Sequence, residues 1–583
     1  MITFAAFACW AFIAAAEAAN PSFMDIDQVQ RGMRGIGKTV FTGTTIDTFA
    51  VEILGVAQHR LGPRRHMILA QLSGGPLAQT GVMQGMSGSP VYIDGRLIGA
   101  VAYTWSFAQI PIAGITPIHD MLAVFERGLE PPQDYGTWAP FELDAQTATL
   151  LPQSATVPDR ITLEPLGTPV WASGFGAAAT RMLDDTLGPF GLHVTTGVDG
   201  GGTIDEAAPF EPGAALGVQL VSGDMSITGI GTLTYVDGDR VLGFGHPMLL
   251  EGATDMPMTG AFIYAPMPSR FLSFKLGAPT RILGAVRQDR AAAIAGVVGP
   301  APAMLPLRVL VRTDQGETTY TCQVLRHQRL TSGLTASVLL GVLEAVSKRS
   351  GPTTLQVRST IAFEDGQDLQ REQIHSGAGA LFQAAITATQ PLVFLSQNPF
   401  DSIRLQKVDF ELEIKENLEL ARVRALRVAE RQLKPGDTFT LEVELQPYRQ
   451  AAIKEHIQIA LPADLKPGPL TLRVGNGSAS QEWELERSPA LLQPRTLAQL
   501  RQLLQRQDRN DNLVVELYRQ EDGISVAGRE LPGLPPSART ILQQENSTGR
   551  LGAVHGRVVL RQRQRTNYVL AGTQTLELTI GKP

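Results

Sequence analysis

Length and composition indicate a large protein with several packed domains. The chain has 583 residues, of which 43% are hydrophobic and 18% charged, and its formal net charge is −6. One hydrophobic core does not support this length, and the composition excludes a wholly disordered chain and a polytopic membrane protein. The charge gives no reason to expect nucleic acid or an anionic membrane surface as a partner.

The N-terminus carries an apolar run, Met1–Ala16. The run is short for a membrane span and is typical of the apolar core of an export signal, with Ala16-Glu17-Ala18 as a small-x-small cleavage site. The alternative is a buried N-terminal helix. We expect residues 1–19 to be a signal peptide and the mature protein to be exported to the bacterial periplasm or medium, without a stable membrane span.

The chain has two cysteines, Cys9 and Cys322. Two are too few for a disulfide framework or a cysteine-based zinc site. Loss of the signal peptide would leave Cys322 as a single unpaired thiol.

Residues 24–110 consist of short apolar runs bounded by glycine, threonine and proline, which is the pattern of strands and turns. The stretch Tyr92–Gly99 predicts a hairpin, because Asp94-Gly95 supplies the positive φ angles of a tight turn. Thr116-Pro117 then predicts a helix that runs to about Arg127, with the threonine as its N-cap.

The next section, residues 131–205, is rich in proline and glycine and predicts a connector with a strand or two. The pattern of short strands and turns returns over residues 206–330. The stretch Leu233–Gly243 repeats the pattern of the earlier hairpin, which suggests two similar β-units. An apolar stripe predicts a helix over Thr331–Ser347.

Alternating apolar and polar residues beyond Lys348 predict half-buried strands of antiparallel sheets. We expect three accessory parts and two helices in this half of the chain. The parts are an α+β segment at 348–417, a β-sandwich-like domain at 418–487 and an α+β or β domain at 488–583; the helices are at about 378–396 and 495–507.

A basic run of arginines near the C-terminus has two possible interpretations. Arg557, Arg561, Arg563 and Arg565 fit a solvated strand face, and alternatively a patch that binds a polyanion.

The segment Gly85-Met86-Ser87-Gly88-Ser89-Pro90 contains the most informative chemistry. A serine between glycines, in a loop that enters a strand, suits a nucleophile, and Gly85 permits a sharp turn. The amides of Gly85 and Ser87 would stabilise the oxyanion of a tetrahedral intermediate. The alternative is an ordinary turn between strands.

A serine nucleophile needs a base, and His246 is the best placed of the nine histidines. It lies in Gly243-Phe244-Gly245-His246-Pro247, directly after the second hairpin, where the glycines and the proline fix the backbone. The alternative is a structural histidine that ends a strand. His119 is a rival base, but the first turn of a predicted helix favours a surface position for it.

These segments resemble the SpoIVB (stage IV sporulation protein B) peptidase family. Gly85–Tyr92 and Gly95–Val101 resemble its serine-nucleophile region, and the former is also similar to the Gly-Asp-Ser-Gly-Gly-Pro segment of chymotrypsin-like proteases. Gly229–Tyr235 with Gly243–His246 resembles the family's base-histidine segment. Gly284–Arg290 is similar to the strand and turn that follow it.

The resemblance implies a mostly β fold with a chymotrypsin-like double β-barrel. It also implies a circular permutation, because the serine unit precedes the histidine unit here and follows it in SpoIVB. We expect a serine-bearing barrel half at 24–130, the connector at 131–205 and a histidine-bearing barrel half at 206–347, followed by the β-sandwich and α+β accessory domains.

The family's aspartate has no counterpart here, because Leu72–Leu77, just upstream of the serine loop, lacks a carboxylate. Asp289, on a predicted turn of the histidine unit, is our first candidate for the acid that orients the imidazole. Glu251 and Asp255 are alternatives. Asp289 otherwise pairs with a neighbouring arginine, Arg287 or Arg290.

The resemblance implies an exported serine endopeptidase that acts on a protein or peptide substrate through an acyl-enzyme. The segment Ala102–Ala113 would line the substrate cleft. No nucleotide, metal or cofactor motif is present, so no cofactor or metal is implied. The alternatives are a weak or inactive peptidase-like scaffold that binds peptides or envelope proteins, and a protein that cleaves only itself. The sequence leaves the oligomeric state open.

Overall fold

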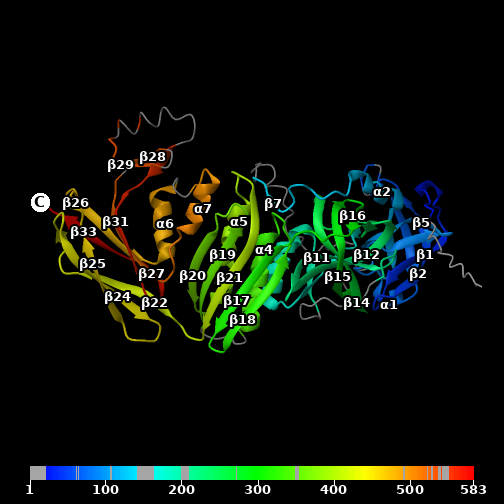
Figure 1. The fold of residues 1–583 in the computed structure, drawn as a ribbon, viewed down its shortest axis with the longest axis horizontal. Coiled ribbons are helices and arrows are strands. Elements are labelled where there is room, and N and C mark those ends of the chain that lie inside the picture. Colours follow the sequence, from blue (N-terminus) through cyan, green and yellow to red (C-terminus); the bar gives the residue numbers. More distant parts are fainter. Residues whose placement is uncertain are drawn as a thin grey trace, which may run out of the picture.

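The computed structural model describes residues 22–60, 62–63, 65–105, 108–140, 163–197, 209–270, 272–347, 353–489, 493–521, 523–526, 529–535, 537, 540 and 551–582. The predicted signal peptide and Cys9 lie outside these residues. The chain is mostly β, and its parts follow one another along the long axis, from the N-terminal sheet to the C-terminal sandwich (Figure 1).

Six strands near the N-terminus form a closed barrel. Their pairings run in the order β1-β2-β3-β6-β5-β4 and return from β4 to β1. The strands are β1 (Arg34–Val40), β2 (Ile46–Ala57), β3 (Met67–Ser73), β4 (Pro90–Ile93), β5 (Arg96–Trp105) and β6 (Ile112–Pro117). The hairpin between β4 and β5 is confirmed, because Asp94 and Gly95 both have positive φ.

A second ring of six strands has the same order of pairing. It runs β11-β12-β13-β16-β15-β14 and returns from β14 to β11. Its strands are β11 (Ala215–Gly223), β12 (Ser226–Asp237), β13 (Arg240–Gly243), β14 (Gly252–Met267), β15 (Phe274–Arg290) and β16 (Ala293–Val298). The two rings are thus similar units, but the two hairpins are not equivalent parts of them. The first hairpin joins the fourth and fifth strands of its ring, whereas the second joins β12 to β13, the second and third strands of its ring.

The connector and the residues after the second ring extend the same sheet. On one side lie β9 (Pro169–Ser173) and β10 (His193–Thr196), and on the other lie β17 to β21. The latter are β17 (Leu305–Thr313), β18 (Gly316–Val324), β19 (Thr354–Phe363), β20 (Leu369–Ser376) and β21 (Ile403–Lys415). Two further strands of the connector, β7 (Thr137–Trp138) and β8 (Leu163–Pro165), pair with β21 and β5.

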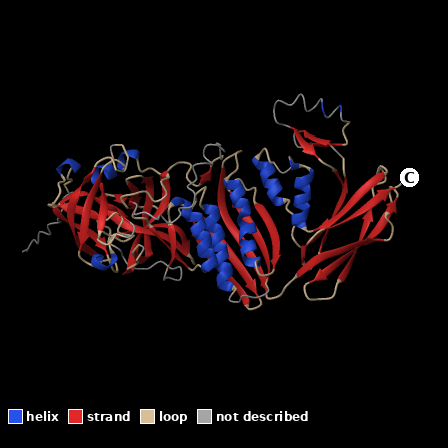
Figure 2. Cartoon of the chain, turned by 180° about the vertical axis from the view of Figure 1, so that it is seen from behind, coloured by secondary structure: helices blue, strands red, loops and turns tan. Residues whose placement is uncertain are grey.

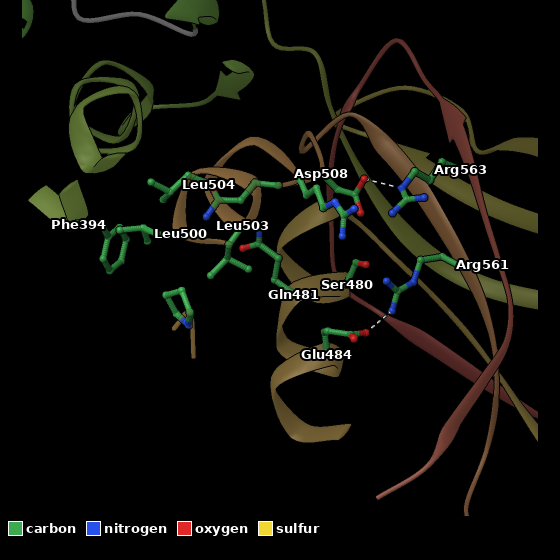
Figure 3. A pocket seen from close by; sticks show the side chains of 13 residues that line it. Phe394, Ser480, Gln481, Glu484, Leu500, Leu503, Leu504, Asp508, Arg561 and Arg563 are labelled. Carbon is green, nitrogen blue, oxygen red and sulfur yellow. Dashed lines mark hydrogen bonds and ion pairs between the residues drawn. The ribbon is translucent and has the colours of Figure 1, made fainter. Parts of the chain in front are cut away.

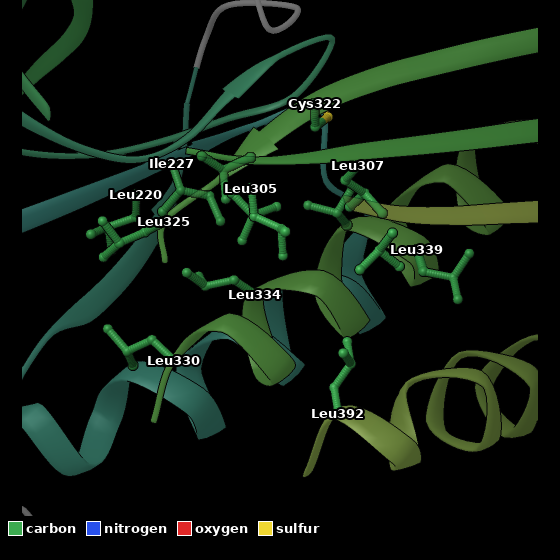
Figure 4. Packing of buried hydrophobic residues seen from close by; sticks show 14 of the residues in the cluster. Leu220, Ile227, Leu305, Leu307, Cys322, Leu325, Leu330, Leu334, Leu339 and Leu392 are labelled. Atoms are coloured by element: carbon green, nitrogen blue, oxygen red, sulfur yellow. The ribbon is translucent and has the colours of Figure 1, made fainter. Parts of the chain in front are cut away.

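Three helices cover one face of this extended sheet (Figure 2). They are α3 (Ala177–Leu187), α4 (Thr331–Val346) and α5 (Ala380–Ser396). The central helix, α4, is buried along most of its length, and its leucines pack against strand residues such as Leu305 and Leu307 and against Leu392 of α5 (Figure 4). The predicted helices at 331–347 and 378–396 are confirmed, and Cys322 lies in this core as an unpaired thiol.

The C-terminal part is a sandwich of two sheets around one core. The first sheet holds β25 (Ile453–Ala460), β24 (Thr438–Pro447), β22 (Leu420–Val428) and β32 (Val569–Ala571), and the second holds β23 (Gln432–Leu433), β33 (Gln574–Ile580), β26 (Gly468–Gly475), β27 (Asn512–Arg519) and β31 (Arg557–Arg565). Our boundary between 487 and 488 is therefore wrong, because β26 pairs with β27 and β33 across it. Local patterning identified the strands but not these distant partners.

Smaller elements complete the described chain. The predicted helix at 495–507 is confirmed as α7 (Leu497–Gln505), next to α6 (Gly477–Arg487). A small sheet contains β28 (Gly523–Val526), β29 (Arg529–Pro532) and β30 (Leu551–Val554). Within the described residues, no helix has the length and apolar character needed to cross a bilayer.

The helix predicted from Thr116 is only partly correct. The structure has a short α2 (Ile118–Leu122) and a 3-10 turn at Phe125–Arg127, while Thr116 still belongs to β6. Thr116 does not cap the helix, because its hydroxyl instead donates to the carbonyl oxygen of Gly245 at 2.6 Å.

The packing of α4 generates a stability prediction. Leu339 is fully buried, so Leu339→Ala should lower the free energy of unfolding by about 2–5 kcal/mol through lost burial and a residual cavity. Leu485→Ala on α6, where the side chain is 52% exposed, should change it by no more than about 0.5 kcal/mol. Urea unfolding monitored by circular dichroism measures both, and equal effects would contradict this description of the core.

Candidate active site

The two predicted reactive residues occupy equivalent loops of the two strand rings. Ser87 lies between β3 and β4, the third and fourth strands of the first ring. His246 lies between β13 and β14, which hold the same positions in the second. The similarity of the two units therefore extends to the loops that carry the candidate nucleophile and base.

These two loops pack against each other at the junction of the rings. The amide of Thr232, on β12, donates to the carbonyl oxygen of Ser87 at 2.7 Å. A Cβ atom on Gly88 would overlap the carbonyl oxygen of Thr232 and would lie 2.5 Å from the amide nitrogen of Phe244. The serine loop thus lies directly against the backbone that leads to His246.

Side chains of β12 fix the carbonyl groups of the serine loop. The Thr232 hydroxyl donates to the carbonyl oxygen of Gly85 at 2.9 Å, and the Thr234 hydroxyl donates to that of Gly88 at 2.7 Å. Together with the Thr232 amide, these bonds direct three carbonyls of the loop toward β12. The conformation of the loop is therefore set by the second ring as well as by its own glycines.

The amides of the serine loop fall into two groups. Those of Met86, Gly88 and Ser89 donate to carbonyls at 3.1, 2.8 and 2.9 Å. Those of Gly85 and Ser87 form no hydrogen bond with any described residue. Unpaired donors are what an oxyanion requires, and these are the two amides to which the sequence assigned that role.

Ser87 and His246 each hold a polar atom that has no partner in the described structure. Both side chains are buried, with 0% and 1% exposure, and neither Ser87 Oγ nor His246 Nε2 forms a hydrogen bond. The two atoms are therefore not hydrogen-bonded to each other. Catalytic hydrogen bonds are often long or unformed in the absence of substrate, so this geometry does not remove the pair as a candidate.

The other ring nitrogen of His246 determines its tautomer. Nδ1 lies 2.7 Å from the carbonyl oxygen of Pro247. A carbonyl only accepts, so Nδ1 carries the hydrogen and Nε2 holds a free electron pair. Burial lowers the pKa of His246 to about 4, so the ring is neutral at pH 7. A neutral imidazole with a free Nε2 is the form that a general base requires.

Asp289 supports the histidine loop but does not contact the imidazole. Its carboxylate is fully buried at the end of β15 and accepts the amides of Met248 and Leu249 at 2.9 and 2.6 Å. Burial raises the pKa of Asp289, and these hydrogen bonds oppose the rise. We expected a hydrogen bond to His246, but the carboxylate instead pairs with the backbone that follows it. Asp289 can therefore affect the orientation of the His246 imidazole only through the backbone of Met248 and Leu249.

The two alternative acids, Glu251 and Asp255, and the rival base, His119, interact with residues other than His246. Glu251 binds Arg329 and lies 3.3 Å from His327 Nε2, while Asp255 pairs with Arg287. The side chain of His119 is 51% exposed and lies 4.0 Å from Asp25 on the surface. None of the three contacts His246 through a hydrogen bond or ion pair.

Sequence reasoning missed several groups at the site. Thr232 and Thr234 lie in the segment that resembles the family's base-histidine region, but nothing in the sequence indicates that their hydroxyls hold the serine loop. Thr116 is predicted to cap a helix and instead donates to Gly245. Lys275 of β15 is fully buried beside Gly85, and nothing in its local sequence distinguishes it from a surface lysine. Among the described residues, no cluster of three or more histidine, cysteine, aspartate or glutamate side chains is arranged to hold a metal ion.

A separate hollow of about 810 Å³ lies in the C-terminal half, between α5, α6, α7 and β31. Two arginines of the basic run line this hollow and form ion pairs. Arg561 pairs with Glu484, and Arg563 pairs with Asp508 (Figure 3). These contacts favour a structural role for the arginines over the polyanion patch. None of the residues that line the hollow belongs to the loops of Ser87 or His246.

The contact between the loops generates a prediction about Gly88. Gly88 and Gly95 both have positive φ, but a Cβ on Gly95 would meet no atom within 4 Å. Gly95→Ala should therefore cost only about 1–2 kcal/mol of backbone strain. Gly88→Ala should cost clearly more, because the backbones of Thr232 and Phe244 must also separate. Thermal unfolding of the two variants measures the difference, and equal melting temperatures would contradict the close approach.

Comparison with known proteins supports the resemblance found in the sequence. Residues 17–122 match the model of the SpoIVB peptidase S55 family. No curated protein and no solved structure matches the chain. The match covers the first strand ring with Ser87 and ends before His246, and it indicates a serine peptidase. The resemblance to the SpoIVB peptidase family is thus confirmed over this N-terminal segment.

Proposed function

We propose that the protein is an exported serine endopeptidase of the SpoIVB type, with Ser87 as nucleophile and His246 as base. The supporting observation is the pair of buried, unpartnered atoms, Ser87 Oγ and His246 Nε2, on packed loops at equivalent positions of two strand rings. We further propose that the rings form a chymotrypsin-like double barrel in permuted order, with the remaining sheets as accessory domains.

The proposed reaction uses only groups of the chain and a water molecule. Ser87 Oγ attacks the carbonyl carbon of a peptide bond while Nε2 of His246 takes its proton. The oxyanion accepts hydrogen bonds from the Gly85 and Ser87 amides. The imidazolium then gives the proton to the leaving amine, and water hydrolyses the acyl-enzyme by the same route in reverse.

The described conformation is closed around the reactive groups. Because Ser87 and His246 are at most 1% exposed, a substrate requires the loops or the strand rings to separate before it can bind. This burial favours the second candidate function, a peptidase-like scaffold with weak or no activity. The two free amides favour the enzyme, since a scaffold has no use for unpaired donors beside a serine.

Export is proposed from the N-terminal sequence. The apolar run before the small-x-small site precedes the first described element, and Cys322 is an unpaired buried thiol, which suits a protein that forms no disulfides. N-terminal sequencing of the secreted protein tests this proposal. A mature chain that starts near Asn20 supports it, and retention of Met1 contradicts it.

A fluorophosphonate probe tests the proposed nucleophile. The wild type should be labelled, Ser87→Ala should lose labelling completely, and His246→Ala should lose it by about 10²-fold or more, because general-base assistance contributes about 10²–10⁴-fold. Ser402→Ala, at an exposed serine of the accessory half, is the matched control and should be labelled like the wild type. Folded wild-type protein that resists the probe at every pH would support the scaffold.

The same assay distinguishes the self-cleavage alternative. Purified wild type that remains full-length, while it turns over added peptides, contradicts self-cleavage as the only activity. Conversion of the wild type but not of Ser87→Ala to fragments, without turnover of any peptide, supports it.

Protonation of His246 should reduce both labelling and stability in acid. The pKa is about 4 in the folded protein and near 6.5 in an unfolded chain, so the unfolded state takes up this proton first as the pH falls. The contribution that the neutral His246 imidazole makes to the free energy of unfolding is fully present above pH 6.5. As the pH falls from 6.5 to 4 this contribution is lost, by up to about 3 kcal/mol.

Urea unfolding at pH 7 and pH 4.5 measures this effect. His246→Gln should lose less stability than the wild type between the two values, while His193→Gln, at an exposed histidine, should behave as the wild type does. Parallel losses in all three proteins would show that His246 does not resist protonation.

A further inference from the structure

A buried lysine lies beside the serine loop without any role in the proposed reaction. Lys275 of β15 has 0% exposure, and its Nζ atom forms one hydrogen bond among the described residues, with Thr39 Oγ1 at 2.6 Å. An ammonium group has three donors, so burial with a single bond is costly and calls for a compensating function.

Lys275 heads a chain of hydroxyl groups that ends on the serine loop. Thr39 Oγ1 also accepts a bond from Ser89 Oγ at 3.0 Å and lies 3.5 Å from Thr232 Oγ1. The Thr232 hydroxyl in turn donates to the carbonyl oxygen of Gly85 at 2.9 Å. The chain therefore joins Lys275 to both ends of the loop, at Gly85 and at Ser89.

The charge of Lys275 sets the direction of this chain. An ammonium group only donates, and Ser89 also donates to Thr39, so the Thr39 hydroxyl gives its own hydrogen to Thr232. Thr232 then gives its hydrogen to Gly85. A neutral amine keeps two N–H donors but also presents an electron pair, so the direction of the chain is no longer fixed. When the amine accepts the Thr39 hydrogen, the bond from Thr39 to Thr232 is lost.

The stem and backbone of Lys275 contact the same loop. A Cβ on Gly85 would lie 3.1–3.3 Å from three carbons of the Lys275 stem, and Gly85 has a φ of +89°. The Lys275 amide donates to the carbonyl oxygen of Gln84 at 3.0 Å, and Gln84 donates to Ser273 at 2.8 Å. One strand of the second ring thus holds the entry to the serine loop.

We propose that Lys275 is a positioning residue, whose ammonium group, acting through Thr39 and Thr232, holds the Gly85–Ser89 loop in the conformation that presents the Gly85 and Ser87 amides. The proposal rests on the proposed peptidase function and adds a pH control to it. Loss of the Nζ proton to solvent removes the fixed direction of the chain and lowers activity.

The surroundings of Lys275 place this change near neutral pH. Burial lowers the pKa of Lys275 to about 7, and the negative charge of Asp47 opposes the decrease. The other groups that face it are the hydroxyls on β1 and β12, the backbone of the serine loop and Pro266, its partner on β14. Activity should therefore rise through pH 4 as His246 deprotonates and fall above pH 7 as Lys275 does.

The pH dependence of the fluorophosphonate labelling rate tests the proposal. In the wild type the rate should fall above pH 7 along a single-ionisation curve and level off near the rate of Lys275→Met. Lys275→Met should be slower at pH 6 and show no such fall, and Thr39→Val, which keeps the amine but breaks the chain, should also lose the fall. Lys38→Met, on the same strand as Thr39, is the matched control and should keep it.

A wild-type rate that does not fall above pH 7, or a fall that persists in Lys275→Met, would overturn the proposal. Hydrogen exchange of the full chain gives a readout that is independent of activity. Amide protection of Gly88 and Ser89, corrected for intrinsic exchange, should decrease about tenfold in Lys275→Met at pH 6 and in the wild type between pH 6 and 8.5. Protection on β16 should not change.

The two measurements separate the possible failures. If the wild type is never labelled but loop protection responds to Lys275 as described, the peptidase function fails and the positioning role stands. If the protein is labelled but neither the rate nor the protection depends on Lys275, the positioning role fails and the peptidase function stands.

Discussion

The arrangement of the site depends on the contact between β12 and the serine loop. Thr232 holds two carbonyls of that loop, at Gly85 and Ser87, and Thr234 holds a third at Gly88. In a trans peptide unit the C=O and N–H groups point in opposite directions, so these bonds orient the amides of Met86, Gly88 and Ser89. The amides of Gly85 and Ser87 share peptide units with the carbonyls of Gln84 and Met86, which accept the amides of Lys275 and Ser89. Because Gly88 has no side chain, the backbone that leads to His246 can approach closely. The bonds from β12 therefore fix the loop of the nucleophile against the backbone of its base, and those at Gln84 and Met86 orient the two free amides.

The burial of the reactive groups is consistent with this tight contact. Leaving a buried hydroxyl and a buried imidazole nitrogen unpaired costs about 1–3 kcal/mol for each group. These two atoms lie on loops that pack together where the two strand rings meet. A junction that stores unsatisfied polar groups is easier to open than a dry apolar interface, because water or a substrate can satisfy them. Access by separation of the loops is thus the physically favoured route.

Local signals in the sequence predicted local features well. The Asp94-Gly95 turn and the apolar stripe of α4 depend on neighbouring residues, and both are confirmed. Features that depend on distant partners were missed or wrong. Thr116 caps no helix because Gly245 takes its hydroxyl, the C-terminal strands pair across a predicted boundary, and Asp289 bonds to backbone amides rather than to the imidazole. The burial of Lys275 could not be predicted from its neighbours in the sequence, because it results from strands that are distant along the chain.

Chain order imposes no constraint on such a site. Ser87 and His246 follow the third strand of their respective rings, so the two loops are equivalent and meet at a junction that either ring can present first. The connector needs only to reach from the end of the first ring to the start of the second, and its strands β8 and β9 pair with a strand of each ring on the way. A serine unit that precedes its histidine unit is therefore compatible with the chemistry, because proton transfer depends on the distance between side chains and not on the order in which they are synthesised.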